Sequence, residues 1–259
     1  PSFFYGDDNV QLGDIAGITL NNSTFYNSEI STNNFGNFTL TGGFWDASRL
    51  RTTGRVGDIL AAGFRNSTLT GSLDELRPSE IICALDVGRI AATNGDMSDL
   101  LINVTGRVRT GITATNITRS TIGVVNELIL LSATNDIRAS AITTGQLTTT
   151  RAGRNITAST FLVSGVITSF TATNEIINSR IEVTGPDGAI ITVSARGISG
   201  DIAASGPITT VSATAGDLSG SITTTGSPGN VGTLSASRDL AIRTDLSGGI
   251  TALNAGRNI

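Results

Sequence analysis

The sequence contains no histidine and no lysine, so all 17 of its basic residues are arginines. These absences exclude pairs of serine or cysteine with histidine, metal sites built from histidine, and Schiff-base lysines. The single cysteine, Cys83, allows no internal disulfide, and it therefore gives no indication of the redox compartment. Because Cys83 lies in an apolar run, we expect a small buried core residue rather than a reactive thiol.

Charge is also scarce, with charged residues at 15% of the chain and a net charge of −4. Sparse arginine on a weakly acidic chain argues against a nucleic-acid partner. No long apolar run is present, so we expect no membrane span in this chain. The sequence begins at Pro1 and stops within a repeat. We therefore expect a piece of a longer parent chain, or a subunit whose end meets another subunit.

Aromatic residues make up only 5% of the chain, and ten of the twelve precede residue 65. A slim repeat structure has little interior volume, so this first quarter should differ from the rest. We expect residues 1–36 to form an aromatic-rich N-terminal cap or docking segment that leads into the first coil. A wider first few coils is the alternative.

What the chain does contain is a repeat of about 20 residues. An Asn, Asp or Glu followed by an apolar residue marks twelve of thirteen repeats, and Gly197-Ile198 is the one glycine variant. The other pairs are Asp14-Ile15, Asn37-Phe38, Asp58-Ile59, Glu80-Ile81, Asp96-Met97, Asn116-Ile117, Asp136-Ile137, Asn155-Ile156, Glu175-Ile176, Asp217-Leu218, Asp239-Leu240 and Asn258-Ile259. A short fixed period is the signature of a solenoid, in which each repeat buries its apolar face against its neighbours.

Within each repeat, apolar residues alternate with Thr or Ser in short runs that end at Gly, Asn or Asp. This alternation predicts β-strands separated by turns. Three runs fill about 20 residues and leave no room for a crossover helix, so each strand must stack on its own copies. We therefore predict an all-β parallel β-helix of about 12 coils, with three short strands per coil and about 4.8 Å between coils. A β-sandwich is the alternative, but it does not explain the regular polar–apolar pairs.

Several columns of equivalent residues can be assigned from the spacing. A serine lies three residues after the marker, and a core residue lies five after it. Glycine eight or nine residues after a marker suits a tight corner with positive φ. The polar residue before the marker suits another corner, where its side chain bonds to nearby main chain or to its own copies. The members are Ser120, Ser140, Ser159 and Ser179; Ile122, Ile142, Phe161 and Ile181; and Gly106, Gly145, Gly165, Gly185, Gly206, Gly226 and Gly249.

The repeat is irregular over residues 37–95, where the step from Ile81 to Met97 is only 16 residues. We expect a loop excursion at 71–90, followed by a regular solenoid over 96–259 that is open at its C-terminal end. The irregular region carries a concentration of carboxylates, namely Asp74, Glu75, Glu80, Asp86, Asp96 and Asp99. Their spacing matches no known ligand pattern, so we expect solvated side chains and neither a metal nor another cofactor.

Phrases such as Leu234-Ser-Ala-Ser-Arg-Asp-Leu-Ala-Ile and Ile250-Thr-Ala-Leu-Asn-Ala-Gly-Arg-Asn-Ile resemble the repeat regions of large bacterial surface proteins. The similarity is to filamentous-haemagglutinin-type and autotransporter-type adhesins, and it covers residues 96–259 well and 14–95 loosely. It implies a right-handed parallel β-helix that is secreted or displayed at the cell surface. The amino-terminal secretion signature of the haemagglutinin type is not visible in residues 1–60.

We expect an extracellular structural protein, not an enzyme, that serves as a fibre, stalk or surface-layer subunit and associates end to end. Open strand edges can pair with the next unit. The alternative is a protein that binds or degrades polysaccharide, for which Asp74, Glu75, Glu80 and Arg77 are the candidate residues. Threonine runs at 148–150 and 223–225 resemble flat ice-binding arrays, but they do not keep one register, which argues against that function.

Overall fold

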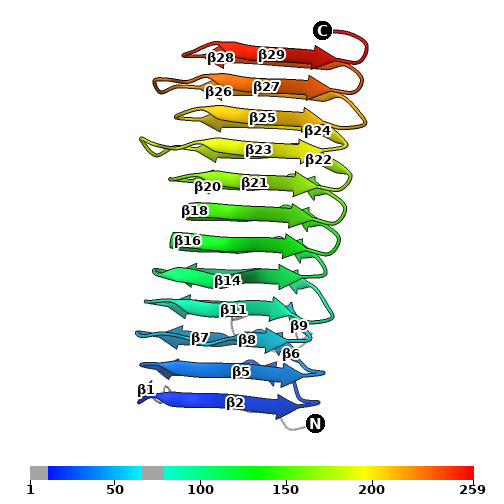
Figure 1. The fold of residues 1–259 in the computed structure, drawn as a ribbon. Coiled ribbons are helices and arrows are strands. Elements are labelled where there is room, and N and C mark those ends of the chain that lie inside the picture. Colours follow the sequence, from blue (N-terminus) through cyan, green and yellow to red (C-terminus); the bar gives the residue numbers. More distant parts are fainter. Residues whose placement is uncertain (1–10, 66–78) are drawn as a thin grey trace, which may run out of the picture. The chain divides into compact units, whose positions relative to one another are not determined.

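The alternating runs form β-strands throughout the residues that the structure, a computed structural model, describes, namely 11–65 and 79–259. These residues contain no helix, and the strands pair in parallel with their equivalents one turn away. The predicted all-β parallel solenoid is therefore confirmed, with about 11 turns. The chain divides into two compact units, Pro1–Glu127 and Leu128–Ile259, in each of which successive turns are stacked as parallel rungs (Figure 1).

In the first unit each turn has three strands, which build three faces in chain order. We call these faces A, B and C. Face A holds β2 (Ile15–Asn21), β5 (Phe35–Thr41), β8 (Ile59–Ala61), β11 (Val87–Ala92) and β14 (Arg107–Ala114). Face B holds β3 (Phe25–Tyr26), β6 (Phe44–Asp46), β9 (Gly63–Arg65), β12 (Met97–Ser98) and β15 (Ile117–Thr118). Face C holds β1 (Gln11–Leu12), β4 (Glu29–Thr32), β7 (Arg49–Thr52), β10 (Ser79–Cys83), β13 (Leu100–Val104) and the start of β16 (Thr121–Ala133).

The second unit follows the same order of faces, but its later turns merge the strands of faces B and C into one. Separate strands are β17 (Ile137–Arg138), β18 (Ala141–Ala152), β19 (Ile156–Thr157) and β20 (Thr160–Val163). Merged strands are β22 (Glu175–Val183), β24 (Gly197–Ala204), β26 (Leu218–Thr224) and β28 (Leu240–Leu246). Face A continues from the second half of β18 through β21 (Ile167–Ala172), β23 (Ile190–Ala195), β25 (Ile208–Ala213), β27 (Val231–Ala236) and β29 (Ile250–Ala255).

The core is a set of apolar columns, because successive strand residues point alternately inward and outward. The column predicted five residues after the marker, Ile122, Ile142, Phe161 and Ile181, is fully buried. In the second unit Phe161 stacks on Ile142 in register, and its ring meets Phe170 edge-on with centroids 4.6 Å apart. Stacking of like side chains thus fills the interior as the repeat predicts.

Five aromatic residues of the first unit also lie inside the turns. The rings of Phe25, Phe38 and Trp45 pack with centroids 4.9–5.2 Å apart, and Phe35 and Phe64 extend the cluster. All five are buried, and the indole N–H of Trp45 donates to the Ser48 carbonyl at 2.8 Å. They are therefore core residues and not a docking surface. Of the other aromatics of the expected N-terminal cap, Tyr26 is half-buried, and Phe3, Phe4 and Tyr5 lie outside the described residues.

The marker pairs before Met97 do not form one column, and that part of the predicted alignment is wrong. On face A Phe38 pairs with Ile18 and Ile59, whereas Ile81 lies on face C beside Leu50. From Met97 onward the markers lie on face B. A polar–apolar pair precedes strands on more than one face, so the pattern alone does not distinguish the faces.

The short step of 16 residues is a consequence of this change of face. Ile81 follows its true partner Leu50 by 31 residues, whereas neighbouring turns are separated by 20 or 21. The turn therefore holds about ten additional residues. Of the excursion predicted at 71–90, residues 71–78 lie outside the described residues, while 79–83 and 87–92 form the strands β10 and β11.

A sharp corner separates faces B and C, and a buried serine stabilises it. The residue before the serine has positive φ, with values of 49° at Ala139 and 48° at Ala158. Ser159 Oγ accepts the N–H of Ser140 at 3.2 Å and donates to the Thr157 carbonyl at 2.9 Å. Ser179 repeats the bond to the N–H of Ser159 at 3.3 Å. The predicted serine column is confirmed, and it supplies acceptors for N–H groups that the corner removes from the sheet ladder.

The predicted glycine column occurs at a different corner, and its physical reason is close backbone approach rather than positive φ. Gly165 donates its N–H to the Gly145 carbonyl at 2.6 Å, and a Cβ on Gly165 would lie 2.8 Å from that oxygen. A Cβ on Gly185 would collide with the Ser164 carbonyl oxygen in the same way. In the second unit, positive φ at glycine occurs instead at Gly200 and Gly220 on the merged strands. These two glycines take the place of the serine corner.

Candidate functional site

The polar residues before the markers form a hydrogen-bonded ladder between turns. In the second unit Asp136 Oδ1 accepts the N–H and the side-chain amide of Asn155 at 2.9 and 3.1 Å. Asn155 Oδ1 in turn accepts the N–H of Glu175 at 3.3 Å, and Asp217 Oδ1 accepts the N–H of Asp239 at 3.1 Å. The predicted main-chain bonding of this column is confirmed, and each such side chain stabilises the neighbouring turn.

The described carboxylates of the irregular region, Glu80, Asp86, Asp96 and Asp99, do not assemble into one site. Asp96 accepts the N–H and the amide of Asn116 at 3.1 and 2.7 Å, and Asp99 forms a two-point ion pair with Arg119 at 2.7 and 2.8 Å. Asp99 raises the pKa of the Arg119 guanidinium by this hydrogen bond. No group of three or more His, Cys, Asp or Glu that could hold a metal occurs in the described parts of the chain.

Asp86 and Glu80 are likewise paired with arginines of other turns. Asp86 accepts from Arg109 at 2.6 Å and from the N–H of Arg107 at 2.9 Å, and these bonds lower the pKa of its carboxyl. Glu80 is 7% exposed and lies 3.0 Å from Arg51 Nη2 and 3.4 Å from Arg49 Nε. The other candidates, Asp74, Glu75 and Arg77, lie outside the described residues.

Cys83 lies within the core, as the apolar run predicted. Its side chain is 1% exposed, with Sγ 3.1 Å from the Gly54 carbonyl. Burial raises the pKa of the thiol above its ordinary 9.0. A protonated, enclosed thiol is a poor nucleophile and metal ligand, so Cys83 serves as a small core residue.

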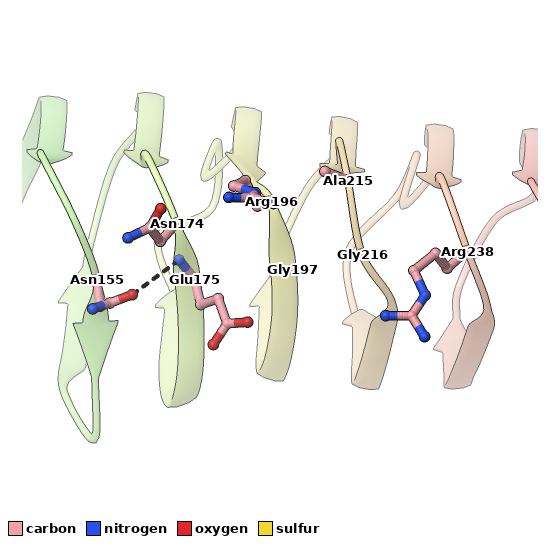
Figure 2. A pocket seen from close by; sticks show the side chains of 8 residues that line it. All are labelled: Asn155, Asn174, Glu175, Arg196, Gly197, Ala215, Gly216 and Arg238. Carbon is pink, nitrogen blue, oxygen red and sulfur yellow. Dashed lines mark hydrogen bonds between the residues drawn. The ribbon is translucent and has the colours of Figure 1, made fainter.

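A polar groove of about 420 Å³ opens on the second unit where the polar ladder is interrupted. Figure 2 shows it crossing successive turns, with Glu175 and Arg238 on either side of Gly197 and Gly216. Asn155, Asn174, Arg196 and Ala215 complete its lining. A second hollow of about 350 Å³ shares Glu175 and Arg238 and reaches Asp217. The groove combines a recess with charged groups, and we take it as the candidate site.

Hydroxyl groups form two columns on face A of the second unit. They keep one register over several turns, with serine and threonine mixed in each column. One column is Thr149, Ser169, Thr192, Thr210 and Thr233, and the other is Thr171, Ser194, Ser212 and Ser235. The threonine runs that suggested an ice-binding array do not share one register, as predicted, because 148–150 belong to β18 on face A and 223–224 belong to the merged strand β26. Ser235 and Ser212 bond to each other at 3.0 Å, and Thr171 donates to the Thr150 carbonyl at 3.3 Å, so part of this hydroxyl surface is satisfied internally.

No protein-family model, curated protein or solved structure matches this chain. The site is therefore described from its own geometry. Sequence reasoning did not identify Asn174, Arg196 or Arg238 as site residues. The one signal that pointed to them is the glycine variant at Gly197, which replaces a side chain in an otherwise polar column.

Proposed function

We propose that the protein is an extracellular structural β-solenoid that serves as a fibre, stalk or surface-layer subunit, akin to the rods of large bacterial adhesins. The observation that carries this proposal is the consistent use of polar side chains between turns. Serines, Asn/Asp pairs and ion pairs such as Asp46–Arg65 at 2.8 Å bond one turn to the next. Polar side chains that bond neighbouring turns to each other suit a protein with a mechanical role.

The direction of these bonds supports a load-bearing role. Strand ladders and side-chain ladders both run along the stacking direction, so separating two turns requires breaking many hydrogen bonds together. One turn of about 20 residues spans roughly 70 Å when fully extended. Pulling a single molecule by its ends is expected to give repeated length increases of about this size, or multiples of it. Smooth extension without discrete steps would contradict a mechanical role.

Location and assembly need separate tests. Antibody labelling of intact cells, viewed by electron microscopy, is expected to mark the outer surface as filaments, stalks or a continuous layer. Labelling that requires permeabilised cells would contradict an extracellular role. Light scattering over a wide concentration range tests end-to-end association, and a monodisperse monomer at every concentration would argue against it.

No helix in the described parts of the chain is long and apolar enough to cross a membrane.

The second candidate function is polysaccharide binding, which the polar groove favours because oligosaccharides require a dense set of hydrogen-bonding groups. Degradation is the less favoured form, since Glu175 is the one carboxylate lining the groove proper. Release of uronate or depletion of a supplied glycan would reveal such an activity.

A further inference from the structure

The groove exists because residue 197 is glycine, and the fold does not require glycine there. A Cβ on Gly197 would lie 3.7 Å from Glu175 Oε1 and 3.8 Å from the Asp217 carbonyl, which are ordinary van der Waals distances. The φ angle of Gly197 is not among the positive values. By contrast, a Cβ on neighbouring Gly216 would lie 2.9 Å from the Arg196 carbonyl and force the backbone to shift. An open recess that a side chain could fill points to a ligand.

Polar groups around this recess are available for binding. Within the described residues, the side chains of Asn174, Glu175 and Arg196 form no hydrogen bond or ion pair with the protein. Arg238 has Asp217 at 3.7 Å, longer than a good charge-assisted hydrogen bond, and it is 53% exposed. An amide, a carboxylate and two guanidinium groups thus face the same groove (Figure 2).

The shape of the groove requires an elongated ligand. Its lining residues come from five successive turns, from Asn155 to Arg238, which at about 4.8 Å per turn corresponds to roughly 19 Å. The groove is open along one side and has no aromatic lining, so neither an apolar small molecule nor a stacked base is favoured. A hydrophilic polymer lying along the stacking direction fits these dimensions.

The charges identify the class of polymer. Guanidinium groups bind carboxylates by paired hydrogen bonds, whereas the amide of Asn174 and the carboxylate of Glu175 suit hydroxyl groups. The continuous phosphates of a nucleic acid would meet Glu175 and Asp217, and the chain carries a net charge of −4. We propose that this groove binds a short stretch of an acidic polysaccharide, whose sugar carboxylates pair with Arg196 and Arg238.

This binding role does not depend on the structural role, because the ladders hold the turns together whether or not the groove is occupied. Titration calorimetry of the full chain with tetragalacturonate tests it, with the methyl-esterified tetramer as the neutral counterpart. We expect saturable binding of the acidic tetramer that weakens as salt is raised. The neutral ester is expected to bind at least about tenfold more weakly, because each lost charge-assisted bond contributes on that scale.

Two variants and one control locate the site. Arg196→Ala is expected to weaken binding about tenfold, and Gly197→Asn to abolish it by filling the recess with an uncharged side chain. Arg151→Ala removes an exposed arginine on face A, away from the groove lining, and is expected to leave the affinity unchanged. Circular dichroism melting establishes that each variant is folded. If Gly197→Asn does not fold, Arg196→Ala decides the result.

Several outcomes would overturn the proposal. These are the absence of saturable binding to wild-type protein, equal affinity for the neutral ester, or equal weakening by Arg151→Ala and Arg196→Ala. Tighter binding of a polyglutamate peptide than of the sugar tetramer would assign the groove to an acidic peptide instead. None of these results bears on cell-surface labelling or stepwise extension, so failure of the groove proposal is distinguishable from failure of the structural one.

Discussion

Replacing Ser159 with alanine tests whether the buried serine column holds successive turns together. The substitution removes the acceptor of the buried Ser140 N–H, which Ser159 Oγ binds at 3.2 Å. The Thr157 carbonyl loses a donor but keeps the N–H of Ala139 at 2.9 Å. The buried Ser140 N–H therefore loses its bond to Ser159 Oγ, which destabilises by about 1–3 kcal/mol.

Urea unfolding and native-state hydrogen exchange measure this change together. Solenoids can unfold in parts, so a single global free energy is insufficient and a local measurement is needed. For Ser159→Ala we expect a lower urea midpoint, together with faster exchange at the Ser140 amide than at amides several turns away. Exchange should accelerate by about 5- to 150-fold, which corresponds to the same free-energy range.

Ser164→Ala is the matched control, because Ser164 is exposed and it is the backbone N–H of Ser164 that donates to the Thr144 carbonyl at 2.9 Å. A surface change of this kind is expected to alter stability by no more than about 0.5 kcal/mol. If Ser159→Ala and Ser164→Ala shift the midpoint equally, or if the Ser140 amide keeps its protection, the column contributes nothing and the reasoning fails.

Three further predictions follow from buried groups. Thr150 is fully buried and its Oγ1 has no hydrogen-bond partner among the described residues, so Thr150→Val should raise the free energy of unfolding by about 1–3 kcal/mol; a lower urea midpoint would contradict this. Gly185→Ala should destabilise by about 1–3 kcal/mol or more in thermal melts, whereas Gly249→Ala, which has open space around it, should be neutral; equal effects would refute the close-approach argument. Cys83 should react with an aromatic disulfide reagent only after unfolding. Because burial raises the pKa of Cys83, the folded state favours the protonated thiol. The contribution of Cys83 to the free energy of unfolding is therefore fully present below pH 9.0 and is lost as the pH rises through the pKa of the folded state. A pH series of urea midpoints measures this loss.

The period and the inward positions of the solenoid could be predicted from sequence because both are local properties. Alternation of apolar and hydroxyl residues determines which side of a strand is buried. Repetition at about 20 residues determines which residues of successive turns stack on each other. Ile142 and Phe161 occupy equivalent positions for this reason, and the structure pairs them in register. The same logic placed Ser159 beside Ser140.

The corners were harder to predict because the residues there do not have a strong local preference. Ala139 and Ala158 adopt a left-handed backbone conformation, which costs about 1–2 kcal/mol at alanine. Residue type therefore does not predict this conformation there. Only tertiary context, including the serine that follows, stabilises that backbone. Conversely, glycines such as Gly165 appeared to mark positive φ, whereas their actual requirement is set by the neighbouring turn, which sequence spacing alone does not describe.

The groove could not be predicted as a site because its residues are far apart in the chain and belong to no shared motif. Arg196 and Arg238 are exposed and Asn174 is half-buried, which is ordinary for a polar residue at the end of a turn. They come together only because the turns stack. The carboxylates that did attract attention by proximity in sequence, such as Asp86 and Asp99, are used for pairing with arginines.

The serine column also implies an order in which the corners are completed during synthesis. The N–H of Ser140 is satisfied by a side chain 19 residues further along, and the N–H of Ser159 by one 20 residues further along. On the ribosome, each newly made corner therefore stays incomplete until the next turn has emerged. A nascent chain would close its corners one turn behind synthesis, and a stalled chain would display one unfinished corner to chaperones, at whichever turn translation had reached.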